Sequence, residues 1–208
     1  MSNDAPPIPS GTPAQPKTRS MGMRIFMAIC GVIIMIGGIT KCASGISSLM
    51  SAGAEKQLLI DSDKAFDKAK HDVADAETNF MALLNDVDSI GLPAVRAKDK
   101  ERAQKTTETF ASASESLHLA AAKLEEAIQK QKDSKLNPYF TEKIKSYNLF
   151  AQASDLNREI IRMVLDESIP DLKALMPKIT EVATRRDETQ AAALKTSADA
   201  EESAKKLK

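Results

Sequence analysis

The sequence predicts an all-α protein in which a single N-terminal transmembrane helix precedes an elongated antiparallel helical bundle of three to four coiled-coil-like helices. The first observation behind this prediction is that seven of the eight glycines lie in the first 53 residues, so residues 55–208 hold one glycine and four prolines. A strand-rich domain would need more turn-forming residues than that. The second observation is an uncharged run near the N-terminus, and the third is a heptad repeat of apolar residues beyond it.

Residues 1–23 are predicted to form a disordered, proline-rich tail. Five of the nine prolines lie in the first 16 residues, and the segment has no apolar face that would build a core. Residues 6–9 and 13–16 each fit the PxxP pattern that SH3-type domains bind. Because such short patterns also arise by chance, a solvated leader is the favoured interpretation.

Residues 24–46 are predicted to anchor the chain in the membrane. Residues 25–39 carry no charge, but as a helix they span only about 22 Å, less than the roughly 30 Å of a hydrocarbon core. The helix is therefore expected to continue to Ile46, with Lys41 directing its amine toward the headgroups. A cleaved signal peptide is the alternative. It is less favoured because the small residues at 52–54 lie far beyond the apolar run and Lys41 directly precedes Cys42.

The charges on either side of the anchor predict its orientation. Lys17, Arg19 and Arg24 precede the apolar run, whereas Lys56 and Lys64 follow it at a comparable distance. Because positive residues are retained on the cytoplasmic side, the N-terminus is expected in the cytoplasm. The chain is thus predicted to be a single-pass membrane protein with a periplasmic or otherwise extracytoplasmic C-terminal domain. Residues 47–55 would link the anchor to that domain, which covers residues 56–208.

Residues 56–132 are predicted to form an antiparallel helical hairpin. Two interleaved heptad series run through each arm, and one series in each arm holds mostly small residues that allow close packing. Gly91, Leu92 and Pro93 separate the arms and are expected to form the turn. The series are Leu59, Phe66, Val73, Phe80 and Val87 with Ser62, Ala69, Ala76, Leu83 and Ile90, and then Ala103, Phe110, Leu117 and Leu124 with Thr106, Ala113, Ala120 and Ala127.

A third helix is predicted over residues 138–168. Asn137 is a suitable N-cap residue, and Pro138 is suited to the first helical position. The apolar face of this helix is wider than a heptad seam, which predicts contact with more than one neighbour. The face consists of Phe140, Ile144, Tyr147, Phe150, Ala153, Leu156, Ile160 and Val164.

A fourth helix is predicted over residues 171–200. Its first half has an apolar face formed by Leu172, Leu175, Met176, Ile179, Val182 and Ala183. Pro177 is expected to kink or end the helix locally, because its ring removes an intrahelical hydrogen bond. Beyond Arg186 the apolar face fades to Ala and Thr, and the charged C-terminus is expected to fray.

The sequence predicts no catalytic, cofactor-binding or metal-binding residues. Glu115 and His118 form half of the paired E-x-x-H device of di-iron bundles, but His71 does not supply a second copy. The heptad register places both histidines on the solvent side. The aspartates at positions 61, 63 and 67 lie within a predicted helix and lack the glycine of a calcium-binding loop. No common enzyme motif is present, so a non-enzymatic protein without a cofactor is expected.

Composition and architecture leave two functional hypotheses. Lys+Arg and Asp+Glu are 29 each and aromatic residues are 4%, so nucleic acid is not an expected partner. The first hypothesis is a membrane-anchored interaction or scaffold protein that binds a protein partner or a second copy of itself, in part through the third helix. A closed bundle with polar outer faces would remove that surface. The second hypothesis is a ligand-binding or sensory bundle with a polar pocket among Tyr139, Tyr147 and Arg158.

Overall fold

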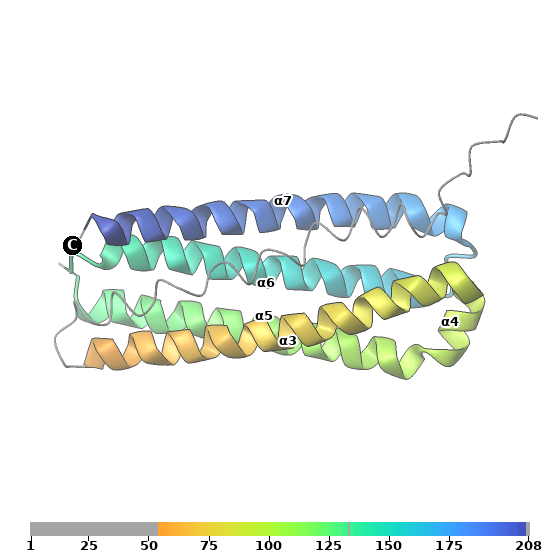
Figure 1. Cartoon of the computed structure of the whole chain (residues 1–208), viewed down its shortest axis with the longest axis horizontal. Coiled ribbons are helices and arrows are strands. Elements are labelled where there is room, and N and C mark those ends of the chain that lie inside the picture. The colour runs from red at the N-terminus through yellow and green to blue at the C-terminus, as the bar shows by residue number, and fades with distance from the viewer. Residues whose placement is uncertain (1–53, 133, 207–208) are drawn as a thin grey trace, which may run out of the picture.

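The protein is all-α, as predicted, and its helices pack into an elongated bundle (Figure 1). The computed structural model describes residues 54–132 and 134–206. The described helices are α3 (Ala54–Ile90), α4 (Leu92–Lys98), α5 (Lys100–Lys130), α6 (Asn137–Leu165) and α7 (Leu172–Lys205). The tail at residues 1–23 and the anchor at residues 24–46 lie outside the described residues and stay predictions. Within the described part of the chain, no helix is both long and apolar enough to cross a membrane.

Four long helices run antiparallel to their neighbours along the bundle axis. The main packing partners are α3 with α5, α5 with α6, and α6 with α7. The first and last helices of this series, α3 and α7, make few direct contacts with each other. The start of α3 and the end of α7 lie at the same end of the bundle (Figure 1). The side chains between α3 and α7 are therefore held in place mainly through α5 and α6.

The burial pattern confirms the heptad register of the hairpin. Every member of both series in the second arm is buried, and so are eight of the ten members in the first arm. Phe66 is half-buried, and Ile90 is 48% exposed because it ends α3. The rings of Phe80 and Phe110 meet edge to face with their centroids 6.1 Å apart. This contact ties α3 to α5 in the half of the bundle that carries the turn.

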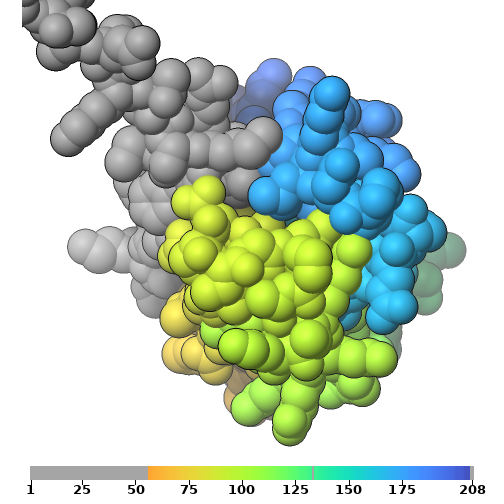
Figure 2. Space-filling model, turned by 90° about the vertical axis from the view of Figure 1, so that its right-hand side faces the viewer, coloured from red at the N-terminus to blue at the C-terminus, as the bar shows by residue number. Residues whose placement is uncertain are grey.

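The turn of the hairpin is longer than the predicted three-residue breaker. Gly91 has φ of +85°, a value that L side chains rarely adopt, and α4 follows it as a separate short helix. The second arm was predicted to run unbroken from residue 94, but Asp99 separates α4 from α5. Burial of Leu92 and Val95 against the core explains this break. In Figure 2, α4 covers this end of the bundle beside the first residues of α7.

An arginine on α4 joins this cover to the end of α6. Arg96 donates from Nε to the carbonyl oxygen of Val164 at 2.9 Å and from Nη1 to that of Ile169 at 2.8 Å. The last carbonyl groups of a helix have no intrahelical partner, and they carry the negative end of its dipole. The guanidinium therefore gives the carbonyl of Val164 a hydrogen-bond partner and places a positive charge at the negative end of the α6 dipole. These contacts also fix the position of α4.

The structure corrects the predicted N-cap of the third helix. Leu136 is the N-cap residue, and Asn137 begins α6 with no capping hydrogen bond. The Asn137 side chain instead donates from Nδ2 to the carbonyl oxygens of Gln131 at 3.0 Å and Lys132 at 2.8 Å. It therefore closes the turn between α5 and α6, because the C-cap residue Gln131 and the next residue offer carbonyl acceptors within its reach. At the other end α6 stops at Leu165, three residues before the predicted boundary.

The last helix is longer than predicted. It begins after Asp171, whose Oδ1 accepts a hydrogen bond from the backbone nitrogen of Ala174 at 2.8 Å, and it continues past Pro177 to Lys205. The predicted boundary at residue 200 is thus corrected, and the fraying of the charged C-terminus stays a prediction. The buried face of the second half of α7 consists of small side chains, which let the α7 backbone approach α6 closely. They are Ala193, Ser197, Ala200 and Ala204.

Candidate functional site

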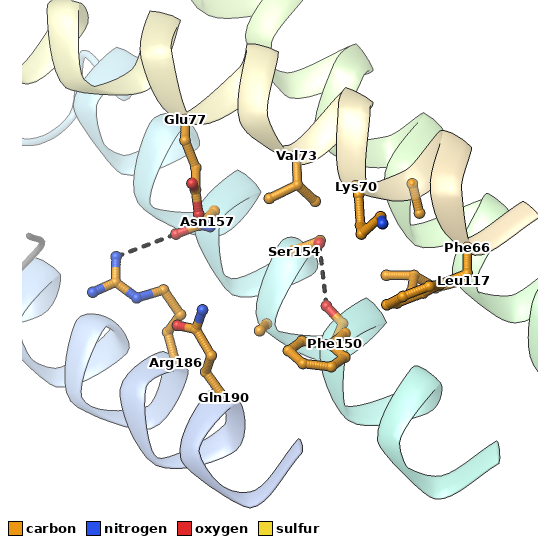
Figure 3. Close-up of a pocket in the computed structure, with 12 residues that line it drawn as sticks. Phe66, Lys70, Val73, Glu77, Leu117, Phe150, Ser154, Asn157, Arg186 and Gln190 are labelled. Carbon is orange, nitrogen blue, oxygen red and sulfur yellow. Dashed lines mark hydrogen bonds between the residues drawn. The ribbon is translucent and has the colours of Figure 1, made fainter. Parts of the chain in front are cut away.

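A hollow lies in the middle of the bundle between α3, α6 and α7, and α5 contributes one side chain to it (Figure 3). It contains about 480 Å³ of space, part of which opens to solvent. The lining combines six polar or charged side chains with apolar ones: Phe66, Ala69, Lys70, Val73, Glu77, Leu117, Phe150, Ala153, Ser154, Asn157, Arg186 and Gln190.

The heptad register explains how α3 contributes to the hollow. Phe66 and Val73 belong to one heptad series and Ala69 belongs to the other, so these side chains lie on the seam of the hairpin. Lys70 and Glu77 each follow a small residue of the second series, which places them at the edge of that seam. An edge position of α3 faces away from α5 toward the other helices. The two charged side chains therefore reach the space between α3, α6 and α7.

Arg186 is the largest polar side chain in the core, with 1% of its surface exposed. Its Nε and Nη2 donate to Asp187 Oδ1 at 2.9 Å and 2.6 Å, and its Nη1 donates to Asn157 Oδ1 at 3.3 Å. A buried charge of this kind is costly unless paired and hydrogen-bonded. The hydrogen bonds to Asp187 and Asn157 hold the guanidinium at the wall that α6 and α7 share (Figure 3).

Glu77 places a carboxyl group on the opposite wall. Burial raises the pKa of Glu77 from 4.5 to about 7, and the charge of Arg186 only partly offsets this rise. Its side chain points toward Asn157 (Figure 3). Among the residues that the structure describes, Glu77 has neither a hydrogen-bond partner nor an ion-pair partner. The hollow thus contains a carboxyl group that changes its protonation state close to neutral pH.

Gln190 is a second polar group in the wall without a partner. Its side chain is 6% exposed and lines the hollow one turn beyond Arg186. Within residues 54–132 and 134–206 it makes no hydrogen bond. Its amide atoms are not buried ones, since the buried side-chain atoms without a partner in the described residues belong to Arg96, Arg102, Asn137 and Arg158. Gln190 and Glu77 together leave both donor and acceptor capacity directed at the hollow.

The apolar part of the lining is partly aromatic. The Phe66 ring stacks on Tyr147 with centroids 4.8 Å apart. Lys70 lies beside it, with Nζ 5.5 Å from the Phe66 centroid and 2.8 Å from Asp67 Oδ1. Phe150 contributes a second ring from α6 (Figure 3). The site therefore offers apolar contact area next to its hydrogen-bonding groups.

A second buried charged group adjoins the hollow toward the start of α3. Lys143 is 7% exposed, and its Nζ lies 5.8–5.9 Å from the ring centroids of Phe66, Tyr139 and Tyr147. Burial raises the pKa of Asp63 to about 6, and the positive charge of Lys143 is the largest effect that opposes this rise. Two carboxyl groups along the inner side of α3 therefore titrate well above their ordinary pH range.

A polar pocket among Tyr139, Tyr147 and Arg158 would favour the second hypothesis, but none of the three lines the hollow. Tyr139 and Tyr147 are both 2% exposed, and both rings face Lys143. Arg158 lies elsewhere, where its Nη1 donates to Asp155 Oδ1 at 2.7 Å. Sequence reasoning also missed Arg186 and Gln190, which stand where the apolar face of the last helix was expected to fade. The available signal was their spacing of seven and eleven residues from Ile179.

The histidines lie where the heptad register places them. His71 and His118 are both exposed, and so is Glu115. His118 Nδ1 lies 3.2 Å from Asn148 Oδ1 on the neighbouring α6. In the described part of the chain, no three His, Cys, Asp or Glu side chains lie close enough to hold a metal ion. The polar chemistry of the bundle is instead concentrated in the hollow.

Comparison with known proteins does not assign this site. The chain matches no known protein family, no curated protein and no solved structure.

Proposed function

We propose that the chain is a non-enzymatic ligand-binding bundle, tethered to the membrane by residues 24–46, with its helical domain outside the cytoplasm. The hollow between α3, α6 and α7 is the binding site for a small molecule. The observation that carries this proposal is the hollow itself, which is lined by the half-buried Glu77 and the buried Gln190, two polar side chains without hydrogen-bond partners among the described residues. A ligand that forms hydrogen bonds with these two side chains would replace the solvent that reaches them through the opening of the hollow.

The rival hypothesis of an interaction or scaffold protein has less support in the structure. It relied on an apolar surplus on the third helix, but Tyr139, Tyr147 and Phe150 are 2%, 2% and 8% exposed. The large apolar side chains that are exposed in the described part of the chain are Ile90 and Leu119. They lie on different helices, at the end of α3 and in the middle of α5, and so do not form one patch.

The lining of the hollow also favours binding over catalysis. Ser154 is the one hydroxyl in the lining, and its Oγ donates to the carbonyl oxygen of Phe150 at 3.1 Å. A serine nucleophile needs a base within hydrogen-bond reach, and this hydroxyl is turned toward its own helix instead. A carboxyl, two amides and apolar walls are the usual means of orienting a bound molecule.

A thermal-shift screen of the full chain in detergent tests this proposal. The panel would contain amines, amino acids, carboxylates, sugars and phosphates. We expect at least one class to raise the melting temperature, because a ligand that binds only the folded state stabilises it. The Ala153→Met variant fills the hollow with a flexible side chain and should abolish the shift.

The matched control is Ala192→Met, which makes the same change at an exposed position on α7. It should leave the shift unchanged. The proposal is wrong if no class in the panel stabilises the chain, or if the two methionine variants respond to the ligand equally.

A further inference from the structure

We propose that one end of the bundle is a docking surface for anionic lipid headgroups, through which the domain rests on the membrane that holds the predicted anchor. This end, called the basic end below, carries five exposed lysines at the ends of α5 and α7 and in the turn between α5 and α6. They are Lys130, Lys132, Lys135, Lys205 and Lys206. The inference rests on the membrane tether of the proposed function and not on its ligand site.

The basic end is the end of the bundle from which the chain leads toward the predicted anchor. The start of α3, the turn between α5 and α6 and the last residues of α7 all lie there (Figure 1). The predicted anchor ends at Ile46, and α3 begins at Ala54. The residues between these two positions can span at most about 25 Å when fully extended. A chain tethered at Ile46 therefore keeps the five lysines close to the lipid headgroups.

The two ends of the bundle differ in charge. Segments 130–136 and 203–206 of the basic end hold five lysines, and Asp133 is their one acidic residue in the sequence. Segments 86–102 and 166–173 of the opposite end hold seven acidic and five basic residues. The bundle thus has a positive end and a negative end along its axis, and its positive end faces the predicted tether.

The preference of helix C-termini for positive side chains does not explain this difference. Because neighbouring helices are antiparallel, each end of the bundle contains the C-termini of two long helices, and the preference would act equally at both. At the opposite end, α3 has Asp86 and Asp88 near its C-terminus and no basic residue in its last turn. At the basic end, Lys132 and Lys135 lie beyond the last turn of α5, where the helix dipole has little effect.

The lysines of the basic end are available to a partner. Lys130 Nζ lies 2.8 Å from Glu126 Oε1, and Lys206 Nζ lies 2.9 Å from Glu202 Oε1. Such exposed ion pairs contribute little stability, so a stronger anionic partner can replace them. The other three lysines have no ion-pair partner among the described residues: Lys132, Lys135 and Lys205.

A lipid surface suits these lysines better than another acidic macromolecule does. An ammonium group on a flexible stem binds a phosphate as a point charge and needs no fixed geometry. The tether also holds the membrane next to the basic end at all times. A nucleic acid or an acidic protein would first have to enter the space between the bundle and the membrane.

Fluorescence quenching in reconstituted vesicles tests the docking. The full chain carries Cys30→Ser and Cys42→Ser, so that a fluorophore attaches only to an introduced cysteine. That cysteine is Gln131→Cys at the basic end or Ser168→Cys at the opposite end, and both positions are exposed. The vesicles contain lipid with a spin-labelled headgroup as the quencher, in phosphatidylcholine alone or mixed with phosphatidylglycerol.

We expect the fluorophore at position 131 to be quenched in the anionic vesicles at about 0.1 M salt. The quenching should be lost at about 0.5 M salt, because salt screens the attraction between the lysines and the lipids. The fluorophore at position 168 should not be quenched in either kind of vesicle. Equal quenching at position 131 in neutral and anionic vesicles would overturn the inference.

Charge variants locate the surface. Lys132→Gln, Lys135→Gln and Lys205→Gln together should lower the ratio of docked to undocked bundle by on the order of 100-fold, from the contribution of each lysine near an anionic surface. The matched control replaces three exposed lysines at the opposite end and should leave the quenching unchanged. Its changes are Lys98→Gln, Lys100→Gln and Lys173→Gln. Equal loss of quenching in the two triple variants would also refute the docking surface.

Failure of the docking differs from failure of the tether. A chain that stays with the vesicles after carbonate extraction, but is never quenched at position 131, would refute the docking and leave the tether standing. A chain that carbonate removes, but that is quenched at position 131 in anionic vesicles before extraction, would refute the tether and leave the docking standing. A chain that binds neither kind of vesicle would refute both.

Discussion

Glu77 carries a carboxyl group in surroundings that favour its neutral form. Its pKa rises from 4.5 to about 7 because burial costs the carboxylate more than the charge of Arg186 returns. Because the pKa of Glu77 is raised on folding, the folded state binds the proton more tightly than the unfolded state does. The stability that this proton binding contributes is complete below pH 4.5 and is lost as the pH rises toward 7. Asp63 acts in the same direction, with a loss between pH 3.8 and about 6. Each group would thus reduce stability at neutral pH.

We therefore expect Glu77→Gln to stabilise the unliganded protein at pH 8, but not at pH 4. The difference between the two pH values should be about 2–3 kcal/mol in the free energy of unfolding, from the linkage between pKa and stability. Denaturant titrations followed by circular dichroism at both pH values measure it. Glu115→Gln is the control, since that side chain is exposed. A variant that is less stable than the wild type at pH 8 would contradict the assigned burial of Glu77.

At the scale of elements, α3 and α5 depend on one aromatic contact in the half of the bundle that α4 covers. Phe80 is 1% exposed and meets Phe110 edge to face. Replacing Phe80 by Ala should lower the free energy of unfolding by about 3–5 kcal/mol, because it removes buried surface and leaves a cavity. Leu119→Ala changes a side chain that is 53% exposed and should cost much less. Urea titrations of both variants would measure this, and equal losses would show that the register is wrong.

The last helix follows a different packing rule from the hairpin. Its second half buries Ala193 and Ala200 with no surface exposed, and Ser146 Oγ on α6 donates to the carbonyl oxygen of Ala193 at 2.9 Å. Small side chains bury little apolar area each, so they give a weak sequence signal. They stabilise α7 by allowing close approach to α6 and a hydrogen bond between side chain and backbone.

For the whole molecule, the membrane anchor decides where the ligand site would lie. We expect the protein to remain in the membrane pellet after carbonate extraction and to keep residues 24–46 when the mature mass is measured. Cysteine labelling of intact cells at an engineered Ala198→Cys, an exposed position on α7, should show the bundle outside the cytoplasm. A soluble product that begins near Gly45 or Glu55 would refute the anchor.

The sequence alone was sufficient for the all-α class and for the register of the hairpin. Large apolar side chains at intervals of seven leave one arrangement that buries them, so Leu59, Val73, Phe80 and Leu117 could be assigned without the structure. The positions of the solvent-facing histidines followed from the same register. Local chemistry also located the turn at Gly91, although not the short helix that follows it.

Only the tertiary structure revealed the hollow and the residues that line it. Arg186 and Gln190 occupy buried positions of α7 that an apolar pattern cannot identify, since their burial depends on the face that α6 presents to them. Glu77 lies at the edge of the hairpin seam, and its pKa is raised by burial in the assembled bundle, an effect that the distant Arg186 only partly opposes. Heptad periodicity reports which side of a helix is apolar, whereas the surroundings of a polar side chain depend on which helices meet around it.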